Sequence, residues 1–172
     1  PMADAGGPYS GGEGSTITFI ASASDPGIAD SHTFSWDFGD GSGASGQTAT
    51  HIFADNGAYV VTMTVTDDDG GTDSRTTSAT VENVAPDAWA GGTYVGAVST
   101  LMTFTGSATD PGTLPNEIQS YSWDFGDGTS AATGQTVSHT YAAAGTYTVT
   151  LTVTDKDGGV GTSTATATVS NP

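Results

Sequence analysis

The stretch that decides the fold is Ser-Trp-Asp-Phe-Gly-Asp-Gly at residues 35–41, which returns letter for letter at residues 122–128. The flanking segments return as well: Val-Thr-Asp-Asp-Asp-Gly-Gly at residues 65–71 matches Val-Thr-Asp-Lys-Asp-Gly-Gly at residues 153–159. The chain of 172 residues therefore consists of two copies of one module. A motif that is present in both copies serves the fold of the module more often than it forms a single catalytic centre, which disfavours an enzyme.

We expect the first module at residues 1–84 and the second at residues 85–172. The segment that joins them is short and carries Pro86, so it should be semi-rigid rather than a flexible tether. Both ends of the chain fall on a repeat boundary, and we expect the parent protein to be longer and to contain further domains.

The composition excludes several classes of partner. The formal net charge is -17, and Arg75 and Lys156 are the only Lys or Arg residues. Nucleic acid is excluded because phosphate contacts need Lys and Arg, and anionic membrane surfaces are disfavoured for the same reason. No apolar stretch approaches a membrane span, and the absence of cysteine rules out disulfides. So acidic a chain should be monomeric unless cations screen its charge.

Strand signals dominate both modules. Polar and apolar residues alternate at residues 16–20 and 102–105, and again at residues 59–66 and 147–154, where threonine fills one face. A period of two with β-branched residues predicts half-buried antiparallel strands. The Gly-x-Tyr that leads into the two most regular predicted strands is similar to the tyrosine corner of immunoglobulin-like sandwiches. The predicted fold is all-β, with two tandem immunoglobulin-like β-sandwich domains.

Both modules carry the same series of motifs in the same order: Trp-Asp-Phe-Gly-Asp-Gly, His-x-Phe/Tyr, Gly-x-Tyr-x-Val, Thr-Val-Thr-Asp and Asp-Gly-Gly. This series resembles the PKD (polycystic kidney disease) domain. The resemblance implies an extracellular or cell-surface location and no catalysis. Bacterial and archaeal members sit beside the catalytic domains of secreted enzymes or in surface proteins, as spacers, adhesion modules or accessory binding modules. The sequence also lacks the motifs of serine hydrolases, zinc proteases and phosphate-binding loops.

The carboxylates are the candidate metal ligands, because Ca²⁺ is bound by six to eight oxygens. In a sandwich of this topology, the loop of Asp25 and the loop after Thr66 should emerge at one end. Asp25 and Asp67 could then share a cation, and Asp110 and Asp155 could do so in the second module. The alternative is that these acids only cap turns or remain as solvated surface charge.

The resemblance adds ligands to this hypothesis. Calcium-binding PKD domains of secreted enzymes use the two loop aspartates together with the linker that enters the domain, which here is the region of Asn83. A second loop aspartate of that pattern is replaced by Gly27 and Gly112, so Asp30 and Glu117 are weaker candidates to substitute for it. Calcium is more strongly expected in the second module, because the first lacks most of its entering linker.

The remaining aromatic and histidine candidates have structural alternatives. Trp89 corresponds to Asp4 in the first module, so the fold does not require it. It is expected either to pack between the modules or at a sheet edge, or to contact a sugar or protein. His51 and His139 should be structural residues that bond across strands, and His32 an exposed strand residue.

These observations favour a non-catalytic spacer or scaffold of a larger secreted or surface protein, with calcium as a possible stiffening cofactor. The partners would be the flanking domains of the parent chain. The alternative is an accessory module that binds polysaccharide or matrix protein. Self-association in cell adhesion is a third hypothesis.

Overall fold

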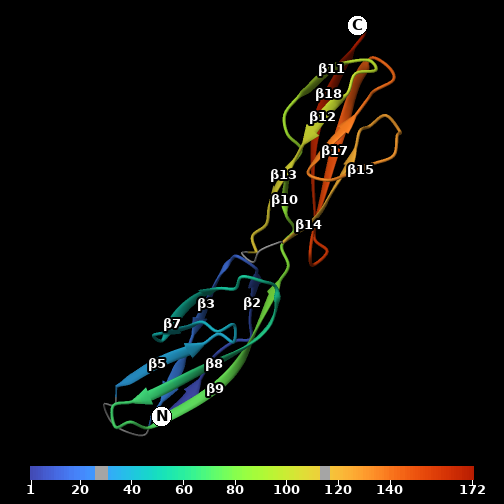
Figure 1. Cartoon of the computed structure of the whole chain (residues 1–172). Coiled ribbons are helices and arrows are strands. Elements are labelled where there is room, and N and C mark those ends of the chain that lie inside the picture. The colour runs from blue at the N-terminus through green and yellow to red at the C-terminus, as the bar shows by residue number, and fades with distance from the viewer. Residues whose placement is uncertain (26–30, 113–116) are drawn as a thin grey trace. The chain divides into compact units, whose positions relative to one another are not determined.

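The computed structural model describes residues 1–25, 31–112 and 117–172 (Figure 1). The chain divides into two compact units, Pro1–Asn83 and Val84–Pro172, each with its own core. All regular elements of the described residues are strands. None of these residues belongs to a helix that is long and apolar enough to cross a membrane.

The strands of the two units follow one another in the same order. In the first unit they are β1 (Met2–Asp4), β2 (Tyr9–Gly12), β3 (Thr16–Ile20), β4 (Ser22–Ser24), β5 (His32–Asp37), β6 (Gly43–Ser45), β7 (Thr48–Ile52), β8 (Gly57–Asp67) and β9 (Thr72–Glu82). In the second unit they are β10 (Asp87–Trp89), β11 (Tyr94–Ala97), β12 (Met102–Thr105), β13 (Ser107–Thr109), β14 (Ile118–Asp124), β15 (Ala132–Thr133), β16 (Thr136–His139), β17 (Gly145–Asp155) and β18 (Val160–Ser170).

Each unit is a sandwich of two sheet layers. One layer of the first unit has the order β2-β9-β8-β5-β6, and the other is built from the pairs β1-β4 and β3-β7. β3 and β4 are separated by Ala21 alone, so the two pairs form one nearly continuous layer. β2 runs parallel to β9, whereas β9, β8, β5 and β6 pair antiparallel. The second unit repeats this arrangement with the order β11-β18-β17-β14-β15.

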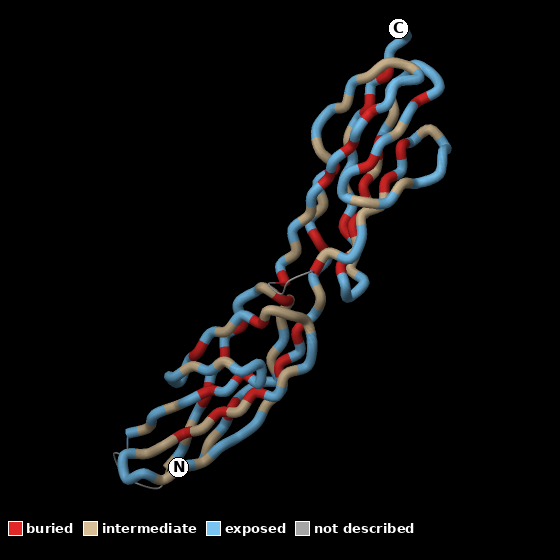
Figure 2. Tube along the Cα trace, viewed as in Figure 1, coloured by how far each residue is buried: buried red, intermediate tan, exposed pale blue. Residues whose placement is uncertain are grey.

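The period of two in the long strands decides which residues fill the core. On β8, Val61, Met63 and Val65 have no exposed surface, while the threonines between them lie on the opposite face. β17 follows the same pattern with Val149, Leu151 and Val153. Because apolar side chains from both layers meet between them, buried residues run through the middle of each unit (Figure 2). The predicted fold class is confirmed.

The repeated Trp-Asp-Phe-Gly-Asp-Gly string is a core residue followed by a tight turn, as predicted. Trp123 is fully buried and its Nε1 donates a hydrogen bond to the Gly134 carbonyl at 2.9 Å. Trp36 makes the same bond to Gly46 at 2.9 Å. In the turns, Asp37 Oδ1 and Asp124 Oδ1 each accept a hydrogen bond at 2.9 Å from the N–H two residues on.

The tyrosine corner is confirmed in both units. The hydroxyl of Tyr59 donates to the Asp55 carbonyl at 2.9 Å, and that of Tyr147 donates to the Ala143 carbonyl at the same distance. Both tyrosines pack against the aromatic core, with Tyr147 stacked on Tyr141 at a ring separation of 4.2 Å. These bonds fix the entry of β8 and of β17.

Candidate functional site

The first unit brings Asp25 and Asp67 to a common point. The amino group of Pro1 lies 2.7 Å from Asp25 Oδ2 and 3.7 Å from Asp67 Oδ2. Both carboxylates are mostly buried, with 13% and 12% of their side-chain surface exposed. The carboxylates that follow β4 and end β8 therefore approach one point, the Pro1 nitrogen.

Asp67 and Asp155 also cap the turns that follow β8 and β17. Asp67 Oδ1 accepts a hydrogen bond from the Gly71 N–H at 2.6 Å. Asp155, only 1% exposed, accepts bonds through Oδ1 from Asp157 at 2.9 Å and from Gly159 at 2.7 Å. One oxygen of each carboxylate thus holds the turn, as the capping alternative predicts, and a cation would have to be bound by the other.

Asp110 has one oxygen that its surroundings do not satisfy. Its Oδ1 accepts a hydrogen bond from the Gly112 N–H at 3.0 Å. Its Oδ2 is buried and has no hydrogen-bond partner in the described part of the chain. Asp110 directly follows β13, whose register with β10 pairs Thr109 with Asp87, so Asp110 lies beside Pro86 of the entering segment. A buried carboxylate oxygen without a partner is costly unless a cation or donor reaches it.

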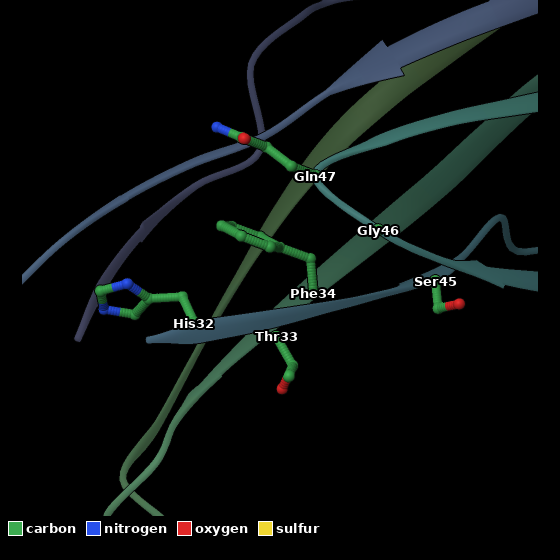
Figure 3. Close-up of a pocket in the computed structure, with 6 residues that line it drawn as sticks. All are labelled: His32, Thr33, Phe34, Ser45, Gly46 and Gln47. Carbon is green, nitrogen blue, oxygen red and sulfur yellow. The ribbon is translucent and has the colours of Figure 1, made fainter. Parts of the chain in front are cut away.

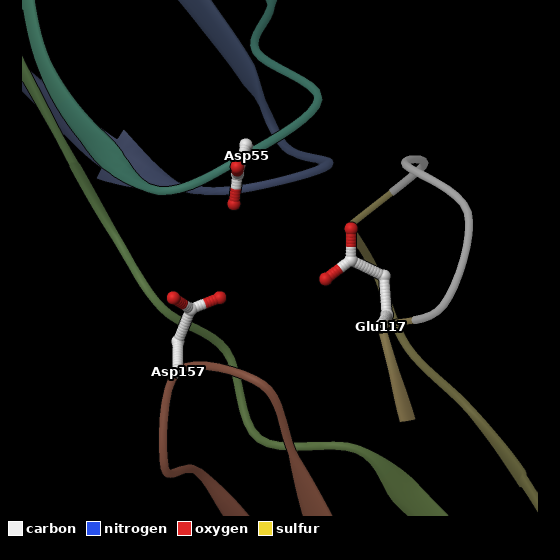
Figure 4. Close-up of side chains that lie close together, drawn as sticks. All are labelled: Asp55, Glu117 and Asp157. Atoms are coloured by element: carbon white, nitrogen blue, oxygen red, sulfur yellow. The ribbon is translucent and has the colours of Figure 1, made fainter. Parts of the chain in front are cut away.

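Of the weaker metal candidates, Glu117 already has a cationic partner. Its carboxylate is 6% exposed and lies 3.3 Å from the Lys156 ammonium, which is also 3.8 Å from Asp157. In Figure 4 the carboxylates of Glu117 and Asp157 are directed toward each other. Asn83, half-buried, ends the first unit, and its role as a ligand stays a prediction. Asp30 lies outside the described residues.

Trp89 ends β10 and pairs with Ser107 of β13. Its side chain is 59% exposed, in contrast to Trp36 and Trp123, which are core residues. The structure thus separates the three tryptophans into two that build the sandwiches and one that is available to solvent. Its predicted contact with a neighbouring module or a ligand stays a prediction.

His51 and His139 each bond to the second aspartate of the repeated turn. The distance from Nε2 to the carboxylate is 2.6 Å for His51 and Asp40, and 2.7 Å for His139 and Asp127. Each imidazole also stacks on the phenylalanine of the motif, at 4.0 Å from Phe125 in the second unit. The histidines are structural, as predicted, but their partner is a turn carboxylate rather than a residue across the strand pair.

These contacts shift the pKa of both turn carboxylates. Burial alone would raise the pKa of Asp127, but hydrogen bonds from Thr129 and His139 outweigh it and hold the pKa below its ordinary 3.8. Asp40, bonded to Ser42 and His51, has a lowered pKa for the same reasons. A carboxylate with a lowered folded-state pKa stabilises the fold above its unfolded-state pKa, and this contribution is lost as the pH falls through the folded-state value.

We therefore expect Asp127→Asn to flatten the acid limb of the stability profile of the second unit. Urea unfolding of the wild type should show a free energy of unfolding that drops as the pH falls below about 4. The variant, which is less stable at neutral pH, should lose a smaller amount over this range. Asp87→Asn, a change at an exposed acid of the same unit, is the matched control and should keep the wild-type slope. Equal slopes in Asp127→Asn and wild type would contradict the assignment.

The first unit also has a pocket that the sequence did not reveal. It has a volume of about 420 Å³ and lies between the start of β5 and the segment after β6 (Figure 3). His32, predicted to be exposed, is half-buried here, and its Nε2 is buried. The prediction was wrong because the side chain lies on the same face of β5 as Phe34 and Trp36, which is the inner face of the sandwich.

Comparison with known proteins gives a consistent assignment. The family profile described as PKD domain matches residues 1–82 and 83–170. The PKD1 domain of Vibrio anguillarum Epp is 35% identical over 53% of this chain and 100% of its own, with a TM-score of 0.42. The PKD1 domain from the Vibrio cholerae metalloprotease PrtV is 30% identical over 51% of this chain and 100% of its own, with a TM-score of 0.40. Both modules of this chain belong to the PKD domain family.

Proposed function

We propose that the tandem is a non-catalytic spacer of a larger secreted or cell-surface protein, which holds neighbouring domains of the parent chain at a set separation. PKD domains are usually non-catalytic modules. One observation supports the proposal: the polar residues that the two units share form hydrogen bonds within their own unit. The turn aspartates, the histidines and the corner tyrosines all bond to their own sandwich.

We propose further that calcium binds at the loop ends and stiffens the units. In the second unit, the support is Asp110 Oδ2, a buried carboxylate oxygen without a partner in the described residues, beside the entering segment. In the first unit, the support is that Oδ2 of Asp25 and Oδ2 of Asp67 lie 2.7 Å and 3.7 Å from the same atom, the Pro1 nitrogen. Carboxylate and carbonyl oxygens are the ligands that Ca²⁺ prefers. When bound, the ion would offset the charge of these loops and would stabilise the folded state by linkage.

Calcium should raise the melting temperature of the wild type, and a chelator should reverse the change. At a free concentration about a hundred times the Kd, one site adds about 2.7 kcal/mol to the free energy of unfolding. Asp110→Ala and Asp155→Ala should each abolish the response of the second unit, and Asp67→Ala that of the first. Differential scanning calorimetry across a calcium titration measures this, with magnesium as the ion control.

Asp87→Ala is the matched control, because Asp87 is an exposed acid close to the same loops. It should keep the full calcium response. If Asp155→Ala and Asp110→Ala both respond like the wild type, or if magnesium has the same effect as calcium, the acids are turn caps and surface charge. The spacer proposal would then stand without its metal.

A binding role is the second candidate, and the exposure of Trp89 favours it. An indole that is 59% exposed on a sheet edge offers a large apolar surface for stacking on a sugar ring or a protein side chain. Polysaccharide or matrix protein would be the partner. The module would then anchor the parent protein instead of spacing it.

Co-sedimentation with insoluble chitin, cellulose and collagen separates the two roles. Under the spacer proposal, wild type and Trp89→Ala remain in the supernatant to the same extent. A bound fraction that Trp89→Ala removes would establish Trp89 as the contact and favour the binding role. Trp89→Phe, which retains an aromatic ring, should then preserve part of the binding.

A further inference from the structure

The pocket of the first unit has the size and the construction of a binding site for one small ring. Its volume of about 420 Å³ lies within the usual range for ligand pockets, roughly 300–1,000 Å³. Its lining comprises His32, Thr33, Phe34, Ser45, Gly46 and Gln47. Figure 3 shows the rings of His32 and Phe34 and the Gln47 side chain on one side of β5, with Thr33 directed to the other side.

His32 contributes a polar atom that has no hydrogen-bond partner among the described residues. The strand register places His32 opposite Asp67 at the start of β5, and the side chain lies on the inner face. Its Nε2 is buried, and the described residues provide no hydrogen bond to it. Such an atom destabilises the fold unless something else supplies the bond, so it marks a position where a ligand hydroxyl would be favoured.

The wall opposite His32 is held in place by backbone bonds. Gly46 donates its N–H to the Phe34 carbonyl at 2.9 Å and accepts the indole N–H of the core residue Trp36 at 2.9 Å. The Gln47 carbonyl accepts the Ala21 N–H at 2.8 Å, which ties this segment to the other sheet layer. The Gln47 residue is nevertheless exposed, so its carboxamide is available as both donor and acceptor. A site fixed in this way loses little conformational entropy on binding.

The lining selects a class of ligand. Among the residues that the structure describes, the lining includes no Asp, Glu, Lys or Arg, although the chain as a whole carries a net charge of -17. Phe34 is half-buried and presents an aromatic ring between an imidazole and a carboxamide. An aromatic face suits the C–H face of a saturated ring, and the imidazole and carboxamide suit hydroxyls around its edge. We propose that this pocket binds one residue of a neutral pyranose sugar.

This site goes beyond the spacer role and does not involve Trp89, although His32 lies opposite the calcium candidate Asp67. The second unit provides an internal comparison, because Gly134 bonds to Tyr121 and Trp123 as Gly46 does to Phe34 and Trp36. The frame is therefore repeated, but Ile118 stands opposite Asp155 where His32 stands opposite Asp67, and the register shifts at Gln119. The imidazole that marks the proposed site belongs to the first unit alone.

The test is a titration of the full two-module chain, labelled with ¹⁵N, with methyl glucoside, methyl galactoside and N-acetylglucosamine, followed by NMR. We expect saturable shifts of the His32 and Gln47 signals with at least one sugar. Phe34→Leu keeps an apolar side chain but removes the ring, and should weaken the apparent Kd at least about tenfold. His32→Ala should weaken it as well. Tyr121→Ala, at the matching position of the second unit, should keep the wild-type Kd.

The melting temperature of each variant should be measured alongside, so that a loss of binding is not confused with unfolding. Absence of saturable shifts with all three sugars would overturn the proposal. So would shifts of wild-type size in both Phe34→Leu and His32→Ala. The calcium response is compared in Phe34→Leu, because Phe34 lies opposite Val65, whereas His32 lies opposite the calcium candidate Asp67.

Discussion

Replacing Trp123 by alanine should lower the free energy of unfolding of the second unit by about 3–5 kcal/mol. The side chain has no exposed surface, and its ring lies 6.1 Å from that of Phe104 in the opposite layer. The substitution would leave a cavity between the layers and would leave the Gly134 carbonyl without its indole donor. Because single domains of this size have only about 5–15 kcal/mol in total, the second unit would be close to unfolding.

Calorimetry or denaturant unfolding followed by circular dichroism measures this change. Trp36→Ala should have an effect of similar size in the first unit, since Trp36 is 3% exposed and makes the equivalent bond to Gly46. The matched control is Trp89→Ala, where the residue is 59% exposed and the change should be within about 0.5 kcal/mol of the wild type. If Trp123→Ala were no more destabilising than Trp89→Ala, the assignment of the repeated tryptophan to the core would be wrong.

Gly126→Ala should be nearly as destabilising, for a different reason. Gly126 has a φ of +72°, and a Cβ at this position would lie 2.3 Å from the Thr148 carbonyl oxygen of β17. The left-handed conformation costs a non-glycine residue about 1–2 kcal/mol, and displacing the backbone of a central strand costs about 1–3 kcal/mol more. We therefore expect a loss of about 3 kcal/mol in the free energy of unfolding.

Gly128→Ala is the control that separates the cost of the left-handed conformation from the cost of the contact with β17. Gly128 lies in the same turn with a φ of +79°, but a Cβ there would meet nothing within 4 Å. Its substitution should cost only the conformational term, about 1–2 kcal/mol. Equal losses in Gly126→Ala and Gly128→Ala would mean that the turn does not press against β17. The first unit offers the same pair in Gly39 and Gly41, where only Gly39 would contact backbone.

The sequence was sufficient to predict the sandwich, because its evidence is local and is repeated. The alternation along β8 and β17 follows directly from the period of a half-buried strand, and the repeated turn carries its own glycines. The tyrosine corner spans four residues, so it could also be read from a short segment. The parallel pairing of β2 with β9 could not, because it joins residues about seventy positions apart that share no pattern.

The site could be predicted less completely, since it depends on where one sheet layer ends relative to the other. His32 was expected to be exposed because nothing in its neighbours indicates that β5 carries it to the inner face beside a pocket. The partner of Glu117 was missed as well. Lys156 replaces Asp68 of the first module, and only the folded turn brings it within 3.3 Å of the carboxylate.

The parallel pairing also has a mechanical consequence. β2 follows β1 near the start of the first unit and β9 is its last strand, and their register joins Tyr9 to Ala79 and Gly12 to Glu82 along neighbouring strands. A pulling force on the two ends of the unit would slide these strands past each other, so the hydrogen bonds between them would carry the load together instead of opening one at a time. β11 and β18 repeat this geometry in the second unit. Resistance to force is governed by the rate of unfolding, and this pairing means that a force on the ends of a sandwich loads it in shear.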